Sequence, residues 1–79
     1  MIKRVIIRNN DNSIASILYI EEDSKLSYRQ SFTVDGTKLM QVDLYLEDYF
    51  IGSVQCWKGK VEEVEMVRDK NGDLVEKEV

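Results

Sequence analysis

The segment from Leu26 to Leu46, LSYRQSFTVDGTKLMQVDLYL, carries the pattern that decides the fold. Apolar and polar residues alternate on both sides of a central Asp35-Gly36 pair, with a period of two rather than 3.6. That period is typical of β-strands that bury one face. An Asp-Gly pair between two such runs is a hairpin signal. The segment therefore predicts two antiparallel strands joined by a tight turn.

Two registers are open for this hairpin. A two-residue turn places Phe32 opposite Leu39 and moves the Met40, Val42 and Leu44 row to the other face of the sheet. A three-residue loop with a left-handed Gly36 instead sets Tyr28 opposite Val42, which keeps the apolar rows together. Because a one-residue slip moves a whole apolar row out of the core, we expect the three-residue, bulged loop.

The same alternation extends along the rest of the chain. It pairs Ile20 with Leu26, Leu46 with Phe50, Val42 with Val54 and Trp57 with Val61. One face then collects the expected core: Ile14, Leu18, Ile20, Leu26, Tyr28, Phe32, Met40, Val42, Leu44, Leu46, Phe50, Val54, Cys56, Val64 and Met66.

The two ends of the chain complete the expected fold. A further strand is expected over residues 2–8, and Asn71-Gly72 predicts a last hairpin. Residues 60–68 fit either a strand or a short helix. The fold class is therefore all-β: residues 1–79 form one small domain, a single antiparallel meander of six to seven strands curled into a small barrel or a folded-over sandwich.

A second apolar side remains in this register. Leu39 stands opposite Trp57 and Tyr45 opposite Ile51, and all four point away from the expected core. Val5, Ile7, Ile17 and Tyr19 are further candidates for that side. An exposed apolar patch commonly marks a contact, so the first four residues are the candidate partner-binding site, with Trp57 and Tyr45 as aromatic anchors. Three explanations stay open: coverage within the fold, a homodimer contact, or contact with another protein.

The charge of the chain is uneven. The net charge is −4, and residues 41–79 carry ten acidic and five basic side chains. The candidate acidic face comprises Glu62, Glu63 and Glu65, either as a solvated surface or as a contact for a basic partner. Because nucleic acid is bound through clustered Lys and Arg, it is an unfavoured partner. A small barrel that stacks single-stranded nucleic acid on Trp57 and Tyr45, beside Lys58 and Lys60, is the alternative.

The sequence offers little for catalysis. It contains no histidine, the commonest general base and zinc ligand. The single cysteine, Cys56, falls on the expected core face. The segment Asp69–Leu74 resembles the start of a calcium loop but has leucine where the turn needs glycine. We therefore expect no enzyme activity, no cofactor and no metal site.

The expected location follows from the cysteine content and the hydropathy. One cysteine precludes an intrachain disulfide, which favours a reducing cytoplasm. No apolar stretch is long enough for a membrane span, so no membrane contact is expected. The sequence thus predicts a non-catalytic cytoplasmic protein-binding module: an adaptor, an inhibitor or a self-associating protein, possible homodimers included. The alternative function is a single-stranded nucleic-acid-binding small β-barrel.

Overall fold

The computed structural model of the chain describes residues 1–78. These residues form seven strands and no helix, so the all-β prediction is confirmed. Residues 60–68, which fitted either a strand or a helix, are a strand. The strands are β1 (Ile2–Arg8), β2 (Ile14–Glu21), β3 (Leu26–Phe32), β4 (Leu39–Leu46), β5 (Tyr49–Gln55), β6 (Lys60–Arg68) and β7 (Leu74–Glu76).

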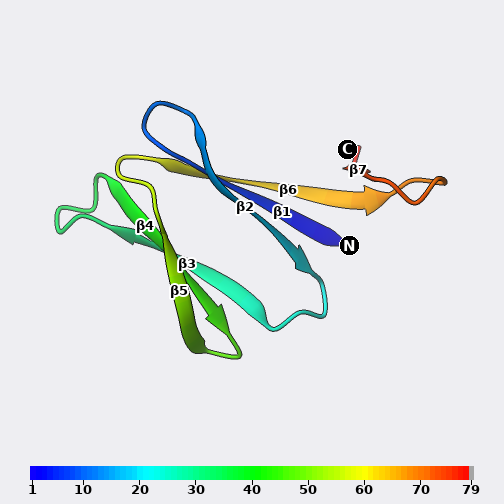
Figure 1. Cartoon of the computed structure of the whole chain (residues 1–79), viewed down its shortest axis with the longest axis horizontal. Helices are drawn as coiled ribbons and strands as arrows, with labels where there is room; N and C mark the ends of the chain where they lie inside the picture. Colours follow the sequence, from blue (N-terminus) through cyan, green and yellow to red (C-terminus); the bar gives the residue numbers. More distant parts are fainter. Residues whose placement is uncertain (79) are drawn as a thin grey trace.

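The strands form two antiparallel sheets rather than one meander (Figure 1). One sheet has the order β2-β1-β6-β7 and the other the order β3-β4-β5. The expected pairings of Ile20 with Leu26 and of Trp57 with Val61 are therefore wrong. The chain leaves the first sheet after β2 and returns to it after β5, where β6 pairs with β1. The sheets do not close into a barrel.

Strand β1 explains why the chain returns. Val5, Ile6 and Ile7 are three consecutive buried residues, so both faces of this strand are covered. A strand that buries both faces is most stable in the middle of a sheet. Strand β1 accordingly pairs with β2 along one edge and with β6 along the other. The prediction of a strand over residues 2–8 is confirmed, but Val5 and Ile7 belong to the core and not to a second apolar side.

The β3–β4 hairpin has a longer loop than the sequence predicts. Thr33 N–H donates to Lys38 O at 2.9 Å, and Gly36 adopts the expected left-handed conformation with φ +74°. Past the loop, Phe32 stands opposite Leu39, but the pairing then shifts at Met40. Tyr28 consequently faces Leu44 rather than Val42. The predicted register is therefore wrong by two residues, which preserves the face of each β3 residue.

The β4–β5 hairpin contains a second irregularity. A two-residue turn, Glu47-Asp48, sets Leu46 opposite Tyr49 instead of the predicted Phe50. The register shifts again at Ile51 before the predicted pair of Val42 and Val54 is reached, and that pair is confirmed. Such bulges add one residue to one strand, so they reverse the alternation beyond them. Phe50 thereby faces outward beside Tyr45.

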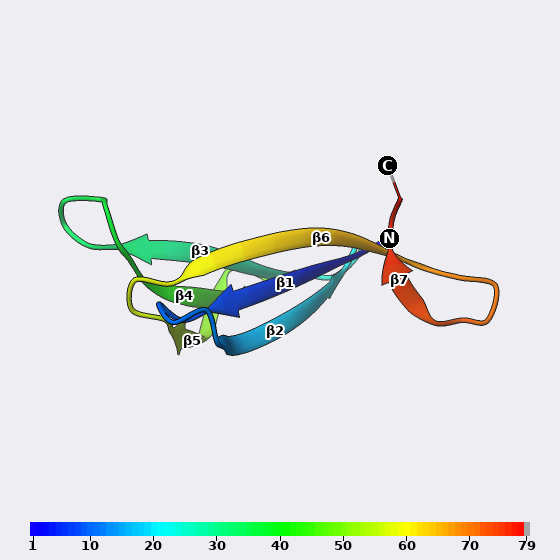
Figure 2. The ribbon, with the colours of Figure 1, turned by 90° about the horizontal axis from the view of Figure 1, so that it is seen from above.

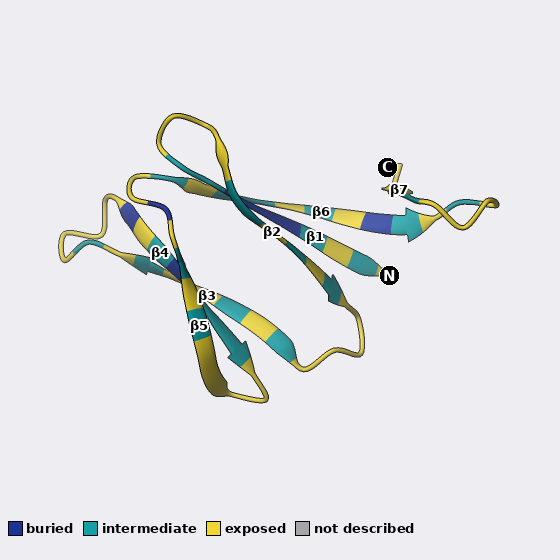
Figure 3. Cartoon of the chain, in the orientation of Figure 1, coloured by how far each residue is buried: buried dark blue, intermediate teal, exposed yellow. Residues whose placement is uncertain are grey.

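The core is small and lies where the two sheets face each other (Figure 3). Its buried members are Val5, Ile7, Leu39, Val42 and Cys56, with Ala15, Leu18, Ile20, Tyr28, Leu44, Val54 and Val61 packed against them. Five residues expected in the core are instead exposed: Ile14, Phe32, Met40, Leu46 and Phe50. Seen from above, β2 and β5 lie along one side of the molecule, and β3 and β6 lie along the other (Figure 2).

Candidate functional site

Leu39 lies in the core and not on the outer face. Its side chain is only 4% exposed and packs with Val42, three residues further along β4. Regular alternation would put these two residues on opposite faces. The bulge at Met40 brings them to the same face, so the prediction that Leu39 points away from the core is wrong.

Tyr45 lies on the outer face of the three-stranded sheet, half-buried by two neighbours. The Phe50 ring meets it edge to face, with ring centroids 5.9 Å apart and planes at 72°. The guanidinium carbon of Arg29 lies 5.0 Å from the Tyr45 ring centroid. Both geometries are favourable for an aromatic ring. Arg29 and Phe50 thus hold the Tyr45 ring in place on the sheet.

Three consecutive residues at the start of β5 are exposed. Tyr49 is 77% exposed, Phe50 60% and Ile51 54%. We call these three residues, with the neighbouring Tyr45, the β5 surface. Tyr45 and Ile51 were predicted to lie on this side, whereas Phe50 was expected in the core. The bulge at Ile51 turns Phe50 out of that core row.

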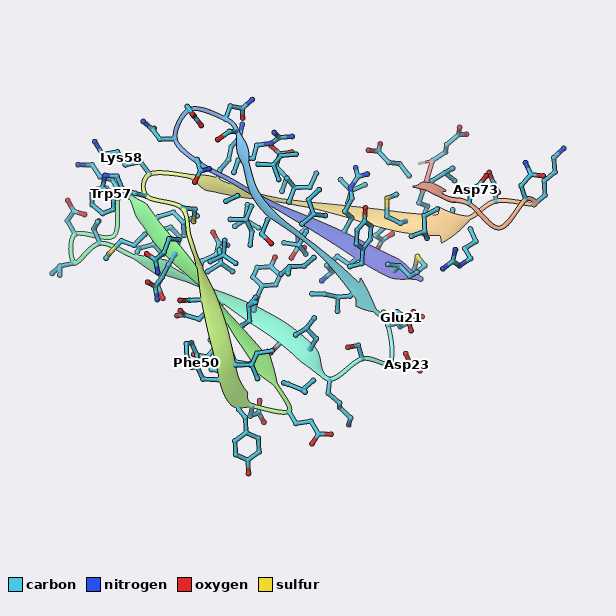
Figure 4. All side chains as sticks on the ribbon, in the orientation of Figure 1. Glu21, Asp23, Phe50, Trp57, Lys58 and Asp73 are labelled. Carbon is cyan, nitrogen blue, oxygen red and sulfur yellow. The ribbon has the colours of Figure 1, made fainter. Side chains whose placement is uncertain are left out.

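Trp57 is also exposed but lies apart from the β5 surface. Its side chain is 53% exposed, and it lies just beyond the last residue of β5. Figure 4 shows Trp57 and Phe50 at opposite ends of this strand. The structure therefore does not gather the four predicted binding residues into one patch. Leu39 is buried, Tyr45 and Ile51 lie near the turn of the β4–β5 hairpin, and Trp57 lies beyond the other end of β5.

Strand β5 is an edge strand of uncharged residues. It is the last strand of its sheet, and its sequence, YFIGSVQ, has neither a charged residue nor a proline. Cys56 N–H donates to Met40 O, so the backbone of Cys56 is directed toward β4. Because the backbone N–H and C=O groups of alternate residues point to opposite edges of a strand, those of Ser53 and Gln55 point to the open edge. Natural proteins usually protect such an edge with lysine, proline or a covering segment. Within residues 1–78 no strand pairs with this edge of β5, and the neighbouring contact is with β2 of the other sheet.

The rest of the outer face of this sheet is polar. Asp43 accepts hydrogen bonds from Ser31 Oγ at 2.7 Å and from Gln41 Nε2 at 2.7 Å, and Gln55 Nε2 donates to Gln41 Oε1 at 3.0 Å. This network satisfies the two carboxylate oxygens of Asp43. It borders the β5 surface and confines the apolar part of the face to the turn end of the hairpin.

The three predicted acidic residues do not share one face. Glu63 and Glu65 point to one face of strand β6, and Glu62 points to the opposite face. Each carboxylate has a cation within 4 Å: Arg8 and Lys60 for Glu62, Lys3 for Glu63 and Lys77 for Glu65. These exposed pairs contribute little to stability, but they reduce the local negative charge.

Glu63 also reaches across the molecule. It lies on the same face of its sheet as Val5 and accepts a hydrogen bond from the hydroxyl of Tyr28, which belongs to the other sheet. Burial, then this hydrogen bond and the charge of Glu63, raise the pKa of Tyr28 to about 12. The contact spans an open cleft of about 360 Å³ lined by Lys3, Ile20, Leu26, Ser27, Tyr28, Gln30 and Glu63.

The chemistry-bearing groups of the described residues are dispersed. Cys56 is buried, as the sequence predicts, and burial raises the pKa of its thiol. Residues 1–78 contain no cluster of three or more His, Cys, Asp or Glu side chains with the spacing to hold a metal ion. The same residues include no helix with the length and apolarity needed to cross a membrane.

Comparison of the chain with protein families, with curated proteins and with solved structures gives no match in any of the three.

Proposed function

We propose that this chain is a non-catalytic cytoplasmic protein that works by contacting another protein molecule through the β5 surface. The observation that carries the proposal is the run Tyr49, Phe50 and Ile51, three exposed apolar residues on an uncharged edge strand. Fully burying one such side chain contributes about 1.5–3 kcal/mol, and large aromatic residues dominate many interfaces. A partner that covers this run gains both apolar burial and backbone pairing along the edge.

The setting of the surface supports contact with a protein. The polar network around Asp43 borders it, as a polar rim borders the apolar centre of typical interfaces. The Tyr45 ring is already held by Arg29 and Phe50, so little side-chain freedom is lost when a partner binds. The neighbouring turn, Glu47-Asp48, adds two carboxylates, which favour a basic group on the partner.

A site-specific photo-crosslink tests the proposal. Benzoylphenylalanine at Phe50 keeps the phenyl ring and adds a benzoyl group, which the exposed position can admit and which reacts only with groups in contact. We expect ultraviolet light to give a protein adduct in cells at this position. The same group at Phe32, which is exposed at the far end of β3, is the matched control and should give none. Absence of a protein adduct at Phe50 would contradict the proposed function.

The alternative function, binding of single-stranded nucleic acid, draws support from the stack of Arg29 on Tyr45 beside Phe50. Aromatic rings beside a guanidinium are suited to stacking bases. Titration of a fluorescent oligonucleotide at two salt concentrations separates the two functions. Affinity that falls steeply with salt and is lost in Tyr45→Ala would favour the alternative, because phosphate contacts release counterions.

A further inference from the structure

We infer that the partner of the β5 surface is a second copy of this chain, joined by antiparallel pairing of β5 with β5 about a twofold axis at Ser53. The inference rests on the proposed function and specifies its partner. Paired in this way, two three-stranded sheets would become one continuous six-stranded sheet. Strand addition at an exposed edge supplies backbone hydrogen bonds, and the facing side chains set the specificity.

The backbone geometry supports an axis at Ser53. The free N–H and C=O groups of Ser53 point to the open edge, so two copies centred there can exchange both hydrogen bonds. This register also sets Gln55 of one copy opposite Ile51 of the other, so the pairing stays within the bounds of β5. In an isologous contact, the same surface of both copies meets across the axis.

The charge pattern fits self-pairing. Antiparallel pairing about a twofold axis brings the same central residues of both copies together, so a charged residue there would be repelled by the identical charge of the other copy. Strand β5 contains none. At its two ends the signs are opposite: the acidic turn Glu47-Asp48 precedes the strand, and Lys58 follows it. The twofold axis brings the acidic end of one copy to the basic end of the other.

The exposed apolar residues of the strand add to the contact. In the register centred on Ser53, Ile51 of one copy lies opposite Gln55 of the other, and Phe50 is next to Ile51 along the strand. Phe50 and Ile51 are both more than half exposed in the single chain. Pairing of the two edges would therefore cover apolar side chains of both copies.

The surface area supports a second copy. The chain exposes 5722 Å², whereas a monomer of its mass, 9.2 kDa, ordinarily exposes about 4900 Å². The excess of roughly 800 Å² is comparable to the area that each partner buries in a standard interface. The molecule is also extended, with a radius of gyration of 13.9 Å against about 12 Å for a compact chain of this length.

The solution mass across a dilution series tests the inference, with two matched serine variants. Ser53→Lys places two like charges at the axis, while within each copy the lysine stands opposite Asp43, so the fold is retained. Ser27→Lys changes the same residue type on the same face at the opposite edge of the sheet. We expect the wild type and Ser27→Lys to be dimers that dissociate on dilution, and Ser53→Lys to be a folded monomer by circular dichroism.

A charge exchange provides the second measurement. Lys58→Glu and Asp48→Lys should each weaken the dimer about tenfold, since each removes two exposed ion pairs across the axis. The double variant should recover wild-type dissociation. Failure of the double variant to recover, or a wild type that stays monomeric at every concentration, would overturn the inference.

The two proposals fail in different ways. A monomeric wild type whose Phe50 crosslinks to a different protein would refute self-pairing and retain the proposed function. A Phe50 adduct with twice the mass of the chain supports both. A monomeric wild type with no Phe50 adduct would refute both.

Discussion

Gly59 lies where the chain crosses back from the three-stranded sheet to β6, and its neighbours leave no space for a side chain. A Cβ atom there would overlap Arg8 O and lie 2.6 Å from Cys56 O. Both obstacles are backbone atoms, so they cannot rotate away. The preceding Lys58 already adopts a left-handed conformation with φ +58°, which makes the crossing tight.

We predict that Gly59→Ala lowers the free energy of unfolding by about 3 kcal/mol or more, because the backbone must move to admit the methyl group. Gly36→Ala is the matched comparison. It has open space around it but a φ of +74°, so it should cost only about 1 kcal/mol. Urea unfolding measures both. Equal losses would show that the crossing at Gly59 adjusts without strain.

The position of individual residues was predictable where the alternation is regular. Cys56 was expected to be buried, and it is; Trp57 was expected to point away from the core, and it is exposed. Leu39 was misplaced because the bulge at Met40 lies between it and Val42. No residue type marks that bulge in the sequence, since Met40 is as apolar as its neighbours.

At the scale of the element, the turn Glu47-Asp48 combines a regular geometry with unfavourable residues. Both positions have positive φ values, +50° and +71°. This is the conformation of a two-residue type I′ hairpin turn, for which Asn-Gly is the preferred sequence. Left-handed conformations are costly for residues with a Cβ atom, so the turn stores local strain.

The double change Glu47→Asn and Asp48→Gly, which installs the preferred Asn-Gly pair, should raise the free energy of unfolding by about 1 kcal/mol. Thermal and urea melts at one protein concentration measure the effect. The substitution Asp48→Val serves as the control and should lower the free energy of unfolding, because a β-branched residue is disfavoured at positive φ. A stabilised Asp48→Val protein would contradict the assigned turn type.

The elements themselves follow from the sequence, but their partners do not. Alternation and turn residues predict strands near the observed positions, and the hairpins at Asp35-Gly36 and Asn71-Gly72 are both present. The connection after Glu21 and the crossing around Lys58 could not be predicted, since a short polar loop has the same sequence character whether it closes a hairpin or passes between sheets. The pairing of β1 with β6 depends on burial of both faces of β1, which emerges only from the assembled molecule.

At the scale of the whole molecule, the Tyr28–Glu63 hydrogen bond joins the two sheets. The pKa of Tyr28 is raised from 10.0 to about 12, with burial as the leading cause. The folded protein therefore keeps the phenolic proton in a range where the unfolded chain loses it. The resulting stabilisation is complete below pH 10 and is lost as the pH rises toward 12.

We predict that the unfolding free energy of Tyr28→Phe falls less between pH 10 and 12 than that of the wild type. Urea titrations at successive pH values measure this dependence. Glu63→Gln should flatten it only in part, because burial of Tyr28 remains when the carboxylate charge is removed. A Tyr28→Phe protein with the pH dependence of the wild type would refute a role for this hydroxyl in joining the sheets.

The pairing of β1 with β6 has a consequence for synthesis. Residues 2–8 pair with residues 60–66, so β1 leaves the ribosome well before the strand that covers its second edge. The β3–β4–β5 unit needs only local contacts and can assemble while that strand waits, because nearby residues meet sooner than distant ones. Nascent chains that stall before residue 60 would thus display an unpaired Val5-Ile6-Ile7 strand, the kind of segment to which chaperones bind and from which aggregates grow.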